Sequence, residues 1–132
     1  MSGWRLSAGI ALAAVLAACG EPAAHQPPVS PNSPAVDVTM TDYKFHPNPI
    51  HVTAGRIRFR ISNVGTVGHD LTILTPDSTR RIAHTALVPP GGQANVSMDL
   101  AAGIYPVICT QPGHLELGME TSVVASPEPN RG

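Results

Sequence analysis

The sequence predicts an all-β fold, a Greek-key β-sandwich or barrel of about seven or eight strands. Short alternating apolar runs recur along the chain, and turn-forming residues separate them. The 132 residues include 14 prolines and 12 glycines, a content that favours many turns over a bundle of long helices.

Each strand is predicted from its own pattern. The clearest runs from 56 to 61, where three arginines alternate with Ile57, Phe59 and Ile61 and so face away from the core. Residues 81–88 are weakly patterned and can be a strand, a helical turn or an irregular crossover. The other expected strands are 36–40, 50–53, 69–74, 93–100, 104–109 and 119–125. We expect 93–100 and 104–109 to pair as a hairpin.

Residues 1–18 are predicted to be a signal peptide, because a short n-region precedes an apolar run too short to span a membrane. The run ends in Leu16-Ala-Ala-Cys19, which resembles the lipobox of bacterial lipoproteins. That resemblance implies cleavage before Cys19 and acylation of this residue. Ordinary secretion, with Cys19 near the cleavage site by coincidence, is the alternative. The resemblance predicts an exported protein that is lipid-anchored at a membrane, on its periplasmic or outer face.

The rest of the chain divides by composition. Residues 19–34 are rich in proline and predict an extended tether. The folded domain is expected over 35–126, followed by a polar tail over 127–132. The formal net charge of −1 gives no electrostatic support for nucleic-acid binding, and we expect a monomer.

One loop concentrates metal-binding chemistry. Cys109, His114 and Met119 are spaced C-x4-H-x4-M. A thiolate, two imidazoles and a weak axial thioether form a type 1 (blue) copper electron-transfer site. The loop lacks one histidine, which His69 can supply if the loop before it lies at the same end of the sandwich. If Cys19 is lipidated, Cys109 has no cysteine left to pair with.

Beyond these residues, the chain resembles the cupredoxins, the small blue copper proteins such as plastocyanin, azurin, auracyanin and rusticyanin. The resemblance covers about Val36 to Val124. The short motifs on which the resemblance rests are, in chain order, Tyr43-Lys-Phe45, Val52-Thr-Ala-Gly55, Ile61-Ser-Asn63, Gly68-His69-Asp70-Leu71, Pro90-Gly91 and Gly103-Ile-Tyr105. The spacing of the loop is most similar to that of auracyanin and rusticyanin. The resemblance implies one copper ion held by His69, Cys109 and His114 in a plane, with Met119 as the distant axial ligand.

The resemblance also implies the surroundings of the thiolate. The backbone N–H groups of Asp70 and Gln111 would donate to it, whereas Pro112 has no N–H to give. Asp70 stands where the family often has asparagine, and it can accept a hydrogen bond from Thr110. Pro106 predicts an edge position or a bulge in the strand that leads to the site.

The expected function is one-electron transport between redox proteins such as cytochromes or a terminal oxidase or reductase, and not enzymatic catalysis. In the family the second histidine reaches the surface through a small apolar patch that suits brief docking. The residues that could form it here are Val64, Val67, Pro90, Leu115 and Leu117. The alternative is a periplasmic copper-binding protein for copper delivery or resistance.

Overall fold

The computed structural model describes residues 33–129, which form nine strands in two sheets. The predicted all-β sandwich is confirmed, with one or two short strands more than expected. The predicted signal peptide and Cys19 lie outside the described residues. Within the described range, no helix has the length and apolar character needed to cross a membrane.

The first sheet has the strand order β2–β1–β4–β7. Strand β1 pairs in parallel with β4, while the β1–β2 and β4–β7 pairs are antiparallel. Because parallel strands end on the same side, the turn after β1 lies at the same end of the sandwich as the loop after β4. The strands are β1 (Ala35–Thr41), β2 (Lys44–His46), β4 (Gly55–Asn63) and β7 (Gln93–Leu100).

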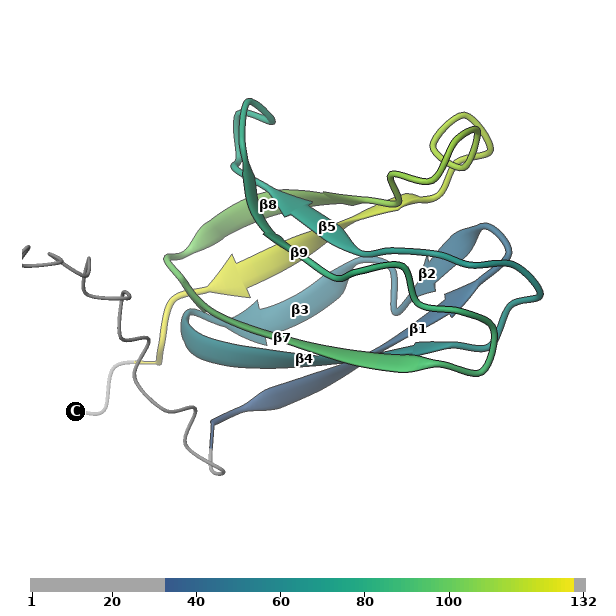
Figure 1. Cartoon of the computed structure of the whole chain (residues 1–132). Coiled ribbons are helices and arrows are strands. Elements are labelled where there is room, and N and C mark those ends of the chain that lie inside the picture. Colours follow the sequence, from purple (N-terminus) through teal and green to yellow (C-terminus); the bar gives the residue numbers. More distant parts are fainter. Residues whose placement is uncertain (1–32, 130–132) are drawn as a thin grey trace, which may run out of the picture.

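The second sheet has the strand order β3–β9–β8–β5–β6. Strand β3 pairs in parallel with β9, and the remaining pairs are antiparallel. The strands are β3 (Ile50–Thr53), β5 (Thr72–Leu74), β6 (Arg81–His84), β8 (Gly103–Ile108) and β9 (Glu120–Ser126). Figure 1 shows the β5, β8 and β9 layer above the β1, β4 and β7 layer.

The core lies between the sheets and follows the alternation of the strands. On β4, Ile57, Phe59 and Ile61 are buried, as the pattern predicts. The arginines between them face outward, and two of them pair with acidic residues of neighbouring strands: Arg56 with Asp99, and Arg60 with Asp37. Burial of the apolar face is therefore the main force that holds this strand in register.

Three sequence expectations need correction. The runs 93–100 and 104–109 do not form a hairpin, because β7 pairs with β4 and β8 pairs with β9 and β5. The short connection at Ala101 instead crosses between the sheets, and its carbonyl accepts a hydrogen bond from the Tyr105 hydroxyl at 2.8 Å. The predicted strand 69–74 is shorter, since His69 forms only an isolated bridge with Val88 and the regular ladder begins at Thr72.

Pro106 lies neither on an edge strand nor at a bulge, because β8 lies inside its sheet and its pairing with β9 passes through Pro106 without a register shift. The ladder between β8 and β5 contains two residue pairs, Thr72 with Ile108 and Ile73 with Val107. Pro106 therefore has a ladder partner on the β9 side, Ser122, and none on the β5 side. The missing N–H is tolerated because the ladder between β8 and β5 has ended before Pro106.

Three loops meet at one end of the sandwich, at the right of Figure 1: residues 64–71, 85–92 and 109–119. Ladder register fixes part of this arrangement, because Ser62 near the end of β4 pairs with Gln93 at the start of β7. Backbone bonds between Asn63 and residues 91 and 92 extend the connection into the loops. This end carries the candidate metal ligands.

Candidate metal centre

Three of the four predicted ligands lie together. One ligand atom each of His69, Cys109 and His114 falls within a cluster whose members are all within 4.8 Å of one another. The Nδ1 atoms of the two histidines are 3.1 Å apart, and the Cys109 Sγ is 3.5 Å from the Nδ1 of His114. Bonds of about 2.0 to 2.3 Å to one central ion require ligand separations of about 3 to 4 Å. The donor set and its spacing therefore fit a single metal ion.

His69 enters the centre from the loop between β4 and β5. Its side chain is fully buried, and its backbone exchanges two hydrogen bonds with Val88, at 2.8 and 3.1 Å. His69 lies at this isolated bridge, before the regular strand begins at Thr72, and its side chain points into the protein. The backbone of His69 is consequently fixed on Val88, which limits the positions open to its ring.

The segment from Cys109 to Met119 is closed by its own backbone. The N–H of Cys109 donates to the carbonyl of Met119 at 3.2 Å, and the N–H of Met119 donates to the carbonyl of His114 at 3.0 Å. Gly113 precedes His114 with a φ of 81°, a conformation that glycine adopts without strain. The Met119 side chain is fully buried, as the predicted axial position at the base of this loop requires.

Asp70 connects the two ligand-bearing segments. Its carboxylate accepts hydrogen bonds from the N–H of Thr110 at 2.9 Å, from the hydroxyl of Thr110 at 2.6 Å and from the side-chain amide of Gln111 at 2.7 Å. The bond from Thr110 was expected from the sequence, and the bond from the Gln111 side chain was not. An ionised carboxylate accepts all three without needing to donate.

The Cys109 thiol sits in a buried, partly polar environment. The N–H of Asp70 donates to its Sγ at 3.5 Å. Burial raises the pKa of the Cys109 thiol, and the backbone N–H groups of Asp70 and Gln111 oppose that rise. Both N–H groups are those that the sequence analysis assigned to the thiolate. A bound metal ion would favour the deprotonated thiolate further.

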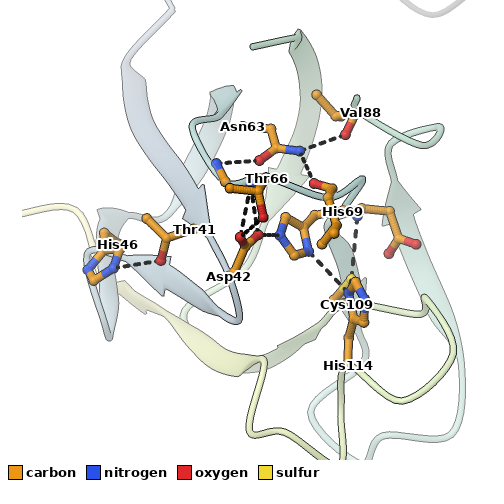
Figure 2. A network of polar contacts seen from close by, with 12 residues as sticks. Thr41, Asp42, His46, Asn63, Thr66, His69, Val88, Cys109 and His114 are labelled. Atoms are coloured by element: carbon orange, nitrogen blue, oxygen red, sulfur yellow. Dashed lines mark hydrogen bonds and ion pairs between the residues drawn. The ribbon is translucent and has the colours of Figure 1, made fainter. Parts of the chain in front are cut away.

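Two residues near the centre were not predicted as part of it. The Asp42 carboxylate accepts a hydrogen bond from the Nε2 of His69 at 2.8 Å, and Figure 2 shows it on the side of the ring away from Cys109. The ring of Tyr43 packs edge-on against His69 and His114, with centroid distances of 5.9 and 4.8 Å. No local sequence signal pointed to them, because the parallel pairing of β1 with β4 is what brings the end of β1 to the site.

The predicted docking residues belong to the three loops that meet at this end and are exposed, and His114 is half-buried. Val64 and Leu117 are the most open, at 63% and 60% exposure. Leu87, at 56%, belongs to the same end and was missed by the sequence analysis. We define the apolar patch as the exposed residues Val64, Val67, Leu87, Pro90, Leu115 and Leu117.

Comparison with solved structures supports the fold. The chain is similar to dithionite-reduced auracyanin from Roseiflexus castenholzii, with a TM-score of 0.64 and 21% identity over 72% of this chain and 98% of that one. It is also similar to auracyanin A, a "blue" copper protein from Chloroflexus aurantiacus, with a TM-score of 0.61 and 21% identity over 70% and 98% of the two chains.

Sequence comparison extends this similarity. The chain is 40% identical over 53 residues to outer membrane protein H.8 of Neisseria meningitidis serogroup B, a match that covers 38% of this chain and 29% of that protein. The chain thus spans less than a third of that relative's length. A family model of the cupredoxin-like domain matches residues 9–120, which is most of the sequence. The chain belongs to the cupredoxin-like domain family.

Proposed function

We propose that this protein carries one electron at a time on a single type 1 copper ion, held by His69, Cys109 and His114 with Met119 as the weak axial ligand. The observation that carries the proposal is the buried cluster of one thiol and two imidazoles whose ligand atoms face one another. Copper in such a donor set supplies a reversible one-electron couple. The similarity to auracyanins, one of which is described as a "blue" copper protein, supports the choice of metal.

The surrounding protein suits electron transfer because it holds the ligands still. The backbone of His69 is fixed on Val88, and Asp70 ties the segment of His69 to that of Cys109. Ligands that are locked by packing and hydrogen bonds keep their geometry when the charge of the site changes. The N–H donated by Asp70 to the Cys109 sulfur withdraws charge from it and helps to set the reduction potential.

We propose that redox partners, such as cytochromes or a terminal oxidase or reductase, dock on the apolar patch. His114 belongs to the same loop as Leu115 and Leu117 and is half-buried, so its ring offers a short path from the centre to the surface. A small apolar surface suits weak, short-lived complexes. In this role the protein is a carrier and not an enzyme.

Leu117 allows a test of the docking surface. Leu117→Glu should slow electron exchange with a partner cytochrome while leaving the reduction potential unchanged. The matched control is Ile104→Glu, because Ile104 is equally exposed at 60% but lies near the start of β8, while Cys109 directly follows the end of that strand. Equal rates for both variants would contradict docking on the apolar patch.

We further propose that the protein is exported and anchored to a membrane through acylated Cys19. The support is the apolar run that ends at this residue, together with a relative that is an outer membrane protein. More than one acyl chain gives stable anchoring. Cys19→Ala should move the protein from the membrane fraction to the soluble fraction, and continued retention would contradict the anchor.

Copper titration tests the main proposal. The purified protein should bind one equivalent of Cu(II), turn intensely blue through the thiolate bond and cycle reversibly by one electron. Cys109→Ser should abolish the colour, whereas His84→Ala, a change to an exposed histidine on β6, should not. A colourless complex that loses copper readily to a chelator would overturn electron transport and favour copper delivery or resistance.

A further inference from the structure

Among the described residues, Asp42 is the one whose carboxylate forms a hydrogen bond with the ring of a candidate histidine ligand. It directly follows β1, and its Oδ1 lies 2.8 Å from the Nε2 of His69. The other ring nitrogen of His69, Nδ1, faces His114 at 3.1 Å. The imidazole is therefore held between a carboxylate on one side and the candidate metal centre on the other, as Figure 2 shows.

This contact decides where the proton of the His69 ring resides. An ionised carboxylate can only accept a hydrogen bond, so the proton must lie on Nε2. The lone pair of a neutral imidazole then lies on Nδ1, the nitrogen that faces the other two ligands. Histidine ligands in metalloproteins are commonly oriented by such a partner on the second nitrogen.

The carboxylate of Asp42 is itself fixed in place. It accepts hydrogen bonds from the backbone N–H of Thr66 at 2.8 Å and from its hydroxyl at 2.6 Å. The side chain of Asp42 is 24% exposed, while that of His69 is not exposed at all.

The loop after β4 is shaped to receive this carboxylate. A Cβ on Gly65 would overlap the Oδ1 of Asp42, so glycine leaves the space that the carboxylate occupies. The buried side chain of Asn63 braces the loop, since it accepts from the N–H of Gly65 at 2.9 Å and donates to the carbonyl of Val67 at 2.8 Å. These contacts give the Asp42–His69 pair a built cradle, which chance contact of a surface acid would lack.

We propose that Asp42 is a positioning residue of the metal centre: it holds His69 as the Nε2–H tautomer with Nδ1 presented to the metal, and its fixed negative charge stabilises the more oxidised ion. The metal part of this proposal rests on the proposed function. The tautomer part does not, because it concerns the metal-free protein.

The tautomer is tested first, by nitrogen NMR of the metal-free protein. The His69 ring should carry its proton on Nε2. Asp42→Asn keeps an oxygen that can accept this bond and should keep the tautomer, whereas Asp42→Ala should give a mixture. A wild-type ring protonated on Nδ1, or an Asp42→Ala ring unchanged from wild type, would overturn the proposal.

The metal part is tested by titration with Cu(II) and by voltammetry. Asp42→Ala should weaken Cu(II) binding about tenfold or more. Asp42→Asn should shift the reduction potential to a more positive value, because it removes the charge and keeps the size. Asp37→Asn is the matched control, since it removes an acid of β1, the strand that Asp42 follows, and this acid pairs with Arg60 at the surface.

The outcomes separate this inference from the proposed function. If wild-type protein forms no blue Cu(II) complex, the proposed function fails together with the metal part, and the NMR result still decides the tautomer. If the wild type is blue but Asp42→Asn and Asp37→Asn have the same potential, the proposed function stands and Asp42 has no effect on the metal. If Asp42→Ala does not fold, the reduction potential is measured on Asp42→Asn, and the tautomer is measured on Gly65→Ala. The methyl group added in Gly65→Ala displaces the Asp42 carboxylate, so the His69 ring of this variant should show the mixture of tautomers. A His69 ring unchanged from wild type would overturn the proposal.

Discussion

Replacing Asp70 by alanine removes the carboxylate that ties the two ligand-bearing segments together. Three hydrogen bonds from Thr110 and Gln111 are lost at a residue that is 4% exposed. A hydrogen bond to a charged group contributes about 1.5 to 3 kcal/mol. Thr110 is exposed, so water replaces part of what is lost. We therefore expect the free energy of unfolding to fall by about 2 to 4 kcal/mol.

Urea denaturation of the metal-free protein measures this effect. A loss of that size should lower the unfolding midpoint by about 1 to 3 M urea for a protein of this size. Asp70→Asn should lose less than half as much. Its amide oxygen still accepts from the N–H of Thr110, the Thr110 hydroxyl can turn to accept, and the Gln111 amide can rotate. The same Asp70→Ala variant should bind Cu(II) with a weaker blue absorption.

Asp99→Ala is the matched control for this experiment. Asp99 accepts a hydrogen bond from the side chain of Arg56, but Asp99 is 70% exposed. An exposed ion pair contributes about 0 to 1 kcal/mol. If Asp70→Ala costs no more stability than Asp99→Ala, then the Asp70 carboxylate does not hold the two segments together.

Three further predictions concern single residues. Burial raises the pKa of the Cys109 thiol. The free energy of unfolding of the metal-free protein should therefore keep its full value below about pH 8.5 and fall as the pH rises through the raised pKa. In urea unfolding, Cys109→Ala should remove this dependence on pH. Hydrogen bonds, first from Thr75 and then from Thr79, lower the pKa of Asp77 to about 2, so its stabilisation should persist above about pH 4 and disappear as pH falls through about 2. An NMR titration midpoint of the Asp77 carboxyl near an ordinary value would contradict this. Phe59→Ala should lower the free energy of unfolding by about 3 to 5 kcal/mol, because this core ring is fully buried; calorimetry that shows a cost below 1 kcal/mol would be incompatible with that packing.

The alternation of apolar residues was sufficient to predict most strands. The predicted ranges 50–53 and 93–100 coincide with β3 and β7. What alternation could not supply was the choice of sheet. The short turn at Ala101 fits a hairpin equally well, but the chain crosses to the other sheet there, and the decision depends on which strands share the core. Local sequence does not contain that information.

The candidate site shows the same division. The spacing of Cys109, His114 and Met119 could be read from the chain because these residues share one loop. His69 could be assigned only on the condition that the loop before it lies at the same end of the sandwich, and the structure meets that condition. Asp42 could not be placed, because its approach depends on the parallel pairing of β1 with β4. The parallel pairing of two strands that are far apart in the sequence leaves no mark on the local pattern of apolar and polar residues.

The backbone hydrogen bond between Cys109 and Met119 joins the two ends of the segment that carries three of the candidate ligands. The segment also lies between the end of β8 and the start of β9, and Asp70 holds Thr110 and Gln111 near its beginning. The residues from Pro112 to Gly118 are therefore a module that can be exchanged for a longer or shorter one, with the sandwich serving as an unchanged support. Variation or engineering confined to these few residues would change the reach of His114 and the solvent access of the centre without refolding the domain.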